Sequence, residues 1–143
     1  MSTKVYDANE VTLVFAGIPI DSGYADGEFI RIAQESDDFT DVVGTDGEVT
    51  RSKTNDRRTT ISVILMQSSV GNAALSALNN LDRAANNGAG VGPILIADRQ
   101  GTSVFAAAEC WISKPPDVSY DREATAREWT LRAACPERFD GGN

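Results

Sequence analysis

One stretch, residues 37–67, constrains the fold of this chain most, because its character changes twice along its length. Its first part, 37–48, holds five acidic residues and no basic one, whereas 51–58 holds four basic residues and one acid. Asp46-Gly47, inside the acidic part, is a strong signal for a tight hairpin turn. From 60 to 67 the residues alternate with the period of two typical of a strand. We therefore expect an extended hairpin arm over 37–58 that leads into a core strand.

The charges of this arm allow two interpretations. A solvated surface hairpin is the usual meaning of such a charged segment. An inter-subunit arm is the alternative, in which the acidic limb of one copy meets the basic limb of the next, and such head-to-tail contacts build rings or filaments. A polar arm with few apolar anchors would be poorly ordered in an isolated chain. The candidate interface residues are Asp37, Asp38, Asp41, Asp46, Gly47, Glu48, Arg51, Lys53, Arg57 and Arg58.

The rest of the chain has the pattern of a mainly β protein with one helix. Strand patterns occur at 11–16, 29–33, 93–98, 104–113 and 126–134, with short edge strands near 17–20 and 118–121. An apolar stripe predicts a helix over 70–85 that packs on the sheet through Ala74, Leu78 and Leu81. We therefore predict a single domain, 1–143: an antiparallel β-sandwich or barrel with one flanking α-helix, a long extended hairpin arm and a loose tail over 136–143.

The net charge of −8 is distributed unevenly along the chain. Residues 1–50 hold eleven acids and two bases, a net charge of −9, whereas residues 51–143 have a net charge of +1. Binding to a nucleic-acid backbone requires clusters of Lys and Arg, which the acidic half lacks. This charge is compatible with a surface that repels DNA, and equally with a surface that only keeps the protein soluble.

The residue types of common catalytic and metal sites are missing or badly spaced. There is no histidine, which excludes Ser-His-Asp and Cys-His systems and every metal site that needs His. The segment 37–48 has Phe39 and Val42 where a calcium loop needs an oxygen ligand and a glycine. We predict no catalytic, cofactor-binding or metal-binding residues. The start lacks the apolar segment of a signal peptide, and no apolar run is long enough to span a bilayer.

Two cysteines, Cys110 and Cys135, fall in predicted strands. Two cysteines alone do not make a zinc site, and we expect buried, reduced thiols of the kind found in a reducing cytoplasm. A disulfide between adjacent strands remains an open alternative.

Several short motifs, in their order and spacing, resemble one protein family. They are Gly27-Glu-Phe-Ile-Arg31, Gly44-Thr-Asp-Gly-Glu-Val-Thr-Arg51, Thr54-Asn-Asp-Arg57, the strand that ends at Gln67, and Ser69-x-x-Asn72-x-x-Leu75-Ser-x-Leu78. Over residues 11–131 this arrangement is similar to the structural tail tube proteins of contractile-tailed bacteriophages. The resemblance implies a β-barrel-like sandwich with a flanking helix.

The resemblance also implies a function. In that family six copies form a ring, and rings stack into a hollow tube inside a contractile sheath. The chain would then be a structural protein of the virion tail, assembled in the host cytoplasm, that conducts DNA into the host. Its implied partners are its own copies, the tail sheath protein, the tape-measure protein in the lumen, and the baseplate and tail terminator proteins. DNA would pass without specific binding, and no membrane would be involved.

Two alternative functions are compatible with the sequence, and the tube function makes one expectation about the charge of the inner wall. The chain could be the inner tube of a phage-tail-like bacteriocin or another contractile injection machine, or a small acidic β-sandwich enzyme or ligand-binding domain. A tube that conducts DNA should not hold its cargo, and a net-negative wall avoids the attraction that free Lys and Arg would add. Glu28 and Glu35 are the candidate lumen acids.

Overall fold

The alternating segment forms strand β6 (Thr59–Met66), the strand around which the core is built. Its inward residues Ile61, Val63 and Leu65 are fully buried in this computed structural model, which describes residues 3–142. Strand β6 pairs antiparallel with β3 (Ile30–Gln34) on one edge and with β9 (Ala126–Ala133) on the other. The predicted core strand is therefore confirmed.

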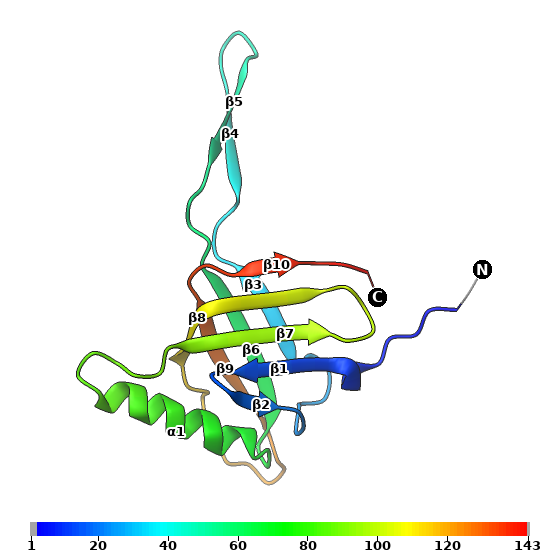
Figure 1. Cartoon of the computed structure of the whole chain (residues 1–143), viewed down its shortest axis with the longest axis vertical. Coiled ribbons are helices and arrows are strands. Elements are labelled where there is room, and N and C mark those ends of the chain that lie inside the picture. Colours follow the sequence, from blue (N-terminus) through cyan, green and yellow to red (C-terminus); the bar gives the residue numbers. More distant parts are fainter. Residues whose placement is uncertain (1–2, 143) are drawn as a thin grey trace.

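The other strands extend the sheet from β9 and fold it over the first three. They are β1 (Val11–Phe15), β2 (Ile18–Ile20), β7 (Gly92–Asp98) and β8 (Val104–Lys114), and the order is β2-β1-β7-β8-β9-β6-β3. A 3-10 turn, η1 (Ala8–Glu10), precedes β1. Strand β8 belongs to both layers, because its first part pairs with β7 and its last part with β9. In Figure 1, β1, β7 and β8 cross in front of β6 and β9, so the predicted mainly β, sandwich-like fold is confirmed.

The core lies between these two layers. Leu13, Phe15 and Ile94 face it from one layer and Ile61 and Leu131 from the other, and all five are at most 2% exposed. In β1 and β7 the residues between the buried ones are exposed, as the pleat of a strand requires, whereas in β6 Ser62 is covered as well as its neighbours Ile61 and Val63. The period-two pattern of the sequence is thus the pattern of burial.

Helix α1 (Gly71–Ala84) closes the end of the sheet that lies opposite the hairpin arm (Figure 1). Leu75 is fully buried, and Leu78 is partly buried against the core. Ala74 is half-buried, whereas Leu81 is 55% exposed. The prediction that Leu81 packs on the sheet is therefore wrong for the single chain.

A polar network explains why the buried face of α1 differs from the apolar stripe. The Asn72 side chain donates to the carbonyl oxygen of Met66 (2.9 Å) and accepts a hydrogen bond from Trp129 Nε1 (2.9 Å). Asn72 and Asn79 are buried on the inner side of the helix. Because buried polar groups are stable only when they are hydrogen-bonded, this network fixes the face that the helix turns inward.

Three smaller expectations are corrected by the structure. Residues 118–121 form no strand, because they lie in a segment without regular structure between Lys114 and Ala126. The predicted loose tail contains strand β10 (Glu137–Phe139), which pairs antiparallel with the start of β8; residue 143 lies outside the described residues. Both cysteines are free, but only Cys110 is buried, since Cys135 is exposed in a bend after β9.

A pair of substitutions tests the orientation of α1. Leu75→Asp places an unpaired carboxylate in the core, which costs several kcal/mol of the roughly 5–15 kcal/mol that stabilise a domain. Leu81→Asp at an exposed position should change the free energy of unfolding of the isolated chain little. Thermal unfolding followed by circular dichroism should show a much lower melting temperature for Leu75→Asp and an almost unchanged one for Leu81→Asp. Equal melting temperatures of the two variants would contradict this placement of the helix.

The two thiols should differ in reactivity. Cys135 is exposed, whereas burial in the core raises the pKa of Cys110 to about 12 and keeps it protonated. Titration of the folded isolated chain with a thiol-reactive disulfide at pH 8 should therefore modify Cys135 only, and denaturant should expose Cys110. Rapid modification of both cysteines in the folded chain would show that the strand carrying Cys110 opens readily.

Candidate functional site

The most prominent feature of the molecule is a hairpin that projects away from the folded domain (Figure 1). Strands β4 (Phe39–Val43) and β5 (Val49–Lys53) pair only with each other and form a separate two-stranded sheet. Every residue of both strands is exposed. The hairpin thus lies within the predicted arm and pairs with no other strand of the described chain.

Local sequence explains the turn of this hairpin. Gly47 adopts a φ of 90°, which glycine tolerates and other residues do not. The amide of Gly44 donates to the carbonyl oxygen of Glu48 (2.8 Å), and the Asp46 side chain accepts from the amide of Glu48 (3.1 Å). The Asp-Gly signal therefore sets the register that places Val43 opposite Val49.

The acidic and basic limbs of the arm lie side by side, although the sequence separates them. Asp41 stands opposite Arg51 in the ladder, and the Arg51 guanidinium carbon lies 4.0 Å from the ring centroid of Phe39. At the base of the arm, Arg58 forms an ion pair with Asp56 (2.9 Å), and its hydrogen bonds hold the pKa of Asp56 well below its usual range. Part of the charge is therefore balanced within the single chain.

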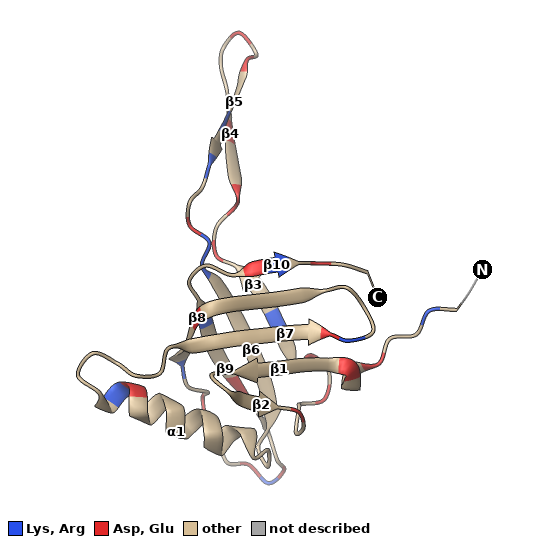
Figure 2. Cartoon of the chain, in the orientation of Figure 1, with Lys and Arg blue, Asp and Glu red and all other residues tan. Residues whose placement is uncertain are grey.

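The remaining charges of the arm are divided between its two ends. Asp46 and Glu48 at the tip form no ion pair among residues 3–142, and neither do Lys53 and Arg57 near the base. Figure 2 shows acidic residues at the tip of the hairpin and both basic and acidic residues nearer the domain. Asp37 and Asp38 also lie near the base, where the Asp38 side chain accepts a hydrogen bond from Gln34 (2.7 Å).

The arm also exposes apolar side chains, none of which packs against the core of its own chain. Phe39 is 44% exposed, and Val42, Val43 and Val49 are each at least 60% exposed. These apolar residues can be found in the sequence, since Val42 and Val43 precede the Asp-Gly turn and Val49 follows it. They are easily overlooked because charged residues stand between them. The arm therefore offers both apolar and charged groups to another surface.

Glu28 and Glu35 lie at opposite ends of β3, and both are paired with arginine. Glu28 forms two hydrogen bonds with Arg31, at 2.5 and 3.0 Å, and these lower the pKa of its carboxyl group. Glu35 accepts from the Thr60 hydroxyl and lies 3.5 Å from Arg132 Nη2. Neither acid predicted for a lumen is therefore an isolated negative charge.

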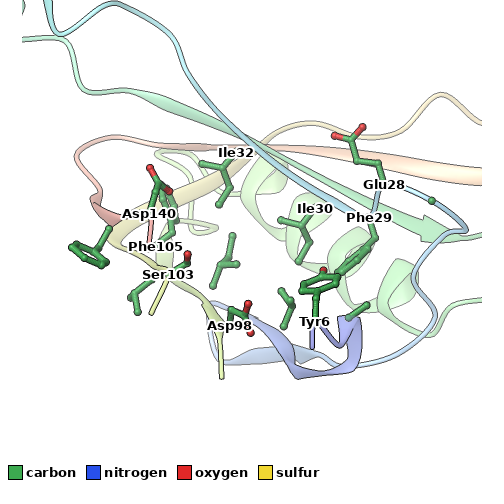
Figure 3. Close-up of a pocket in the computed structure, with 15 residues that line it drawn as sticks. Tyr6, Glu28, Phe29, Ile30, Ile32, Asp98, Ser103, Phe105 and Asp140 are labelled. Atoms are coloured by element: carbon green, nitrogen blue, oxygen red, sulfur yellow. The ribbon is translucent and has the colours of Figure 1, made fainter. Parts of the chain in front are cut away.

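A mostly apolar hollow of about 510 Å³ lies between β3 and the ends of β7 and β8 (Figure 3). Ile30 and Ile32 point into it, whereas the carboxylate of Glu28 points out of it. The Ser103 hydroxyl is engaged in hydrogen bonds with the backbone of Gly141 (3.0 Å).

The described residues contain no group of acids and cysteines that could hold a metal ion. They also include no helix long and apolar enough to cross a membrane.

Comparison with known sequences identifies similar phage proteins. A family model described as the bacteriophage PhiTE tail tube protein matches residues 1–137. Structural protein ORF10 of Pseudomonas phage KPP10 is 28% identical over 146 residues, which span 99% of this chain and 84% of that protein.

Comparison with solved structures shows that the fold is shared with parts of contractile machines. The anti-feeding prophage tube-terminating cap matches with a TM-score of 0.64 and 10% identity, over 97% of this chain and 93% of that chain. A chain from the PVC sheath–tube complex, part of an extracellular contractile injection system, matches with a TM-score of 0.59 and 12% identity. That match spans 93% of this chain and 90% of the other.

Proposed function

We propose a function for this chain that starts from its family: the chain belongs to the bacteriophage PhiTE tail tube protein family. It is a structural subunit of the tail tube and hence a component of the virion tail. In our proposal six copies close into a ring, and rings stack into a hollow tube that conducts DNA into the host when the tail contracts. The role is structural and needs no catalytic residue or cofactor.

The projecting hairpin is the observation that supports this proposal best. A two-stranded hairpin alone is only marginally stable in water, and this one exposes Phe39, Val42, Val43 and Val49. None of these residues packs against the core of its own domain, so in our proposal another copy supplies the covering surface. The contact joins the arm of one copy to a different surface of the next copy. Head-to-tail contacts of this kind build an open filament of unlimited length when the copies do not close into a ring. The arm thus stacks one ring on another.

Individual ion pairs at an exposed interface contribute about 0–1 kcal/mol each. Asp46, Glu48, Lys53 and Arg57 would therefore select the orientation of the contact more than they strengthen it. The apolar residues of the arm and its two free strand edges supply most of the stabilisation of the contact between rings. Each copy in a ring makes the same contact, so the stabilisation is multiplied by the number of copies.

The partners outside the tube subunit follow from the same proposal. The solved relatives include a sheath–tube complex and a sheath/tube terminator of an extracellular contractile injection system. We place a sheath protein around the tube, a tail terminator and a baseplate at its ends, and a tape-measure protein in its lumen before ejection.

A second candidate function is the inner tube of a phage-tail-like bacteriocin or another contractile injection machine. The similarity to the anti-feeding prophage and PVC structures favours it, whereas the similarity to a protein of phage KPP10 favours a phage. Neighbouring genes separate the two, since capsid and terminase genes nearby indicate a phage.

Excision of the hairpin tests the role of the arm. The amide of Thr54 donates to the carbonyl oxygen of Asp38 (2.8 Å), so these residues can be joined through an Asn-Gly turn after deletion of residues 39–53. Because the hairpin does not touch the core, the shortened chain should unfold at nearly the temperature of the parent. Negative-stain microscopy should show tubes for the parent only, and normal tubes from the shortened chain would refute the role of the arm.

The conduit proposal makes a separate prediction. The net charge of −9 in residues 1–50 should give a wall without attraction for phosphate. Assembled tubes of the parent protein should not retain double-stranded DNA in sedimentation assays at physiological salt. Measurable retention, or a net-positive bore in a reconstructed tube, would refute the conduit proposal and leave the tube assignment intact.

A further inference from the structure

The sheet turns two chemically different faces outward. On one side Pro19, Val14, Leu95 and Ala106 are cross-strand neighbours on β2, β1, β7 and β8. Val14 is 36% exposed and Leu95 45% exposed. Figure 2 shows β1, β2 and most of β7 without charged residues. We call these four residues the uncharged face.

The outward side of β3, β6 and β9 is mostly polar instead, with the half-buried Ile64 as an apolar exception beside Glu128. Arg31, Ser62 and Thr130 are neighbours across the three strands, and Ala33, Thr60 and Arg132 form the next row. Their strand neighbours Ile61, Val63 and Leu131 are buried in the core, so these rows lie on the opposite side of the sheet. Arg31 and Ala33 are exposed and Thr60, Thr130 and Arg132 are half-buried, whereas Ser62 is covered by its neighbours. We call the two rows the polar face.

The two faces suit different environments in a hollow tube. Exposed Val and Leu side chains are stabilised by contact with another protein, whereas Arg, Ser and Thr are readily hydrated. A tube subunit needs one surface for neighbouring proteins and one for a water-filled bore. We propose, on the basis of the tube function above, that the polar face lines the bore and that Glu28 and Glu35 neutralise Arg31 and Arg132 so that passing DNA is not held.

The geometry of both ion pairs supports this role. Arg31 binds Glu28 through two of its nitrogens, Nε at 2.5 Å and Nη2 at 3.0 Å from the two carboxylate oxygens. The carboxylate of Glu128 also raises the pKa of Arg31 and therefore lies near it. Glu35 holds Arg132 (3.5 Å) and is itself fixed by the Thr60 hydroxyl. Each guanidinium group of the polar face thus has a carboxylate of its own chain beside it.

The carboxylate of Glu28 occupies two nitrogens of Arg31 that a phosphate would use, whereas Glu35 meets Arg132 through Nη2 only. A free guanidinium binds phosphate through two parallel hydrogen bonds, as it binds a carboxylate. Every phosphate neutralised by a cation adds a salt-dependent attraction, and a tube repeats that attraction in each copy. The placement of two acids beside two arginines matters more in this account than the total number of acids.

Matched variants separate this placement from net charge. Glu28→Gln/Glu35→Gln removes two negative charges, the carboxylates that bind Arg31 and Arg132 directly. Glu123→Gln/Glu137→Gln removes the same charge at exposed residues that form no ion pair in the described chain. Tubes of each variant are mixed with a short fluorescent DNA duplex and sedimented over a range of salt concentrations.

The first variant should retain the duplex at low salt, about tenfold above the parent and the control, and lose it as salt is raised. Adding Arg31→Gln/Arg132→Gln to that variant should abolish retention. Equal retention by the two Gln variants would overturn the inference. So would a reconstruction of parent tubes that places Arg31 and Arg132 on the outer wall. A parent protein that forms no tubes at all would instead contradict the proposed function.

Discussion

The antiparallel pairing of β3 with β6 determines both the core and the arm. The ladder runs to the pair Gln34–Thr59 and continues through the amide of Glu35, which donates to the carbonyl oxygen of Arg58 (3.1 Å). Paired backbone resumes between Asp38 and Thr54 and extends to the tip. The arm is therefore a continuation of two core strands, and the sheet sets its direction. A shift of this register by one residue would turn the buried face of β6 to solvent.

The two halves of this strand pair are stabilised in different ways. Within the domain, Ile61, Val63 and Leu65 are fully buried between the layers. In the arm every strand residue is exposed, and the ladder is only two strands wide. Such a ladder gains little from its own chain, because burial and not pairing supplies most of the stability of a sheet. The subunit thus folds as a domain, and in the proposed tube other copies complete its arm.

Local sequence patterns predict much of this architecture, but they do not reveal contacts between residues that are far apart in the sequence. Alternation and the Asp-Gly turn identify β6 and the arm. The orientation of α1 depends on Asn72, a polar residue that is buried only because it bonds to Trp129, 57 residues away in sequence, and Leu81 is exposed as a result. The pair Glu35–Arg132 joins residues 97 positions apart. A sequence can therefore suggest acids for a lumen without showing that each is already paired.

The central claim, that neighbouring copies stabilise the arm, is tested most directly by hydrogen exchange in the free chain and in assembled tubes. Amides of β4 and β5 should exchange rapidly in the isolated subunit and become strongly protected after assembly. Amides of β6, which pair on both edges, should be protected in both states and serve as the internal reference. Equal protection of β4 and β5 in the two states would contradict the account, because the arm would then be either stable alone or free in the tube.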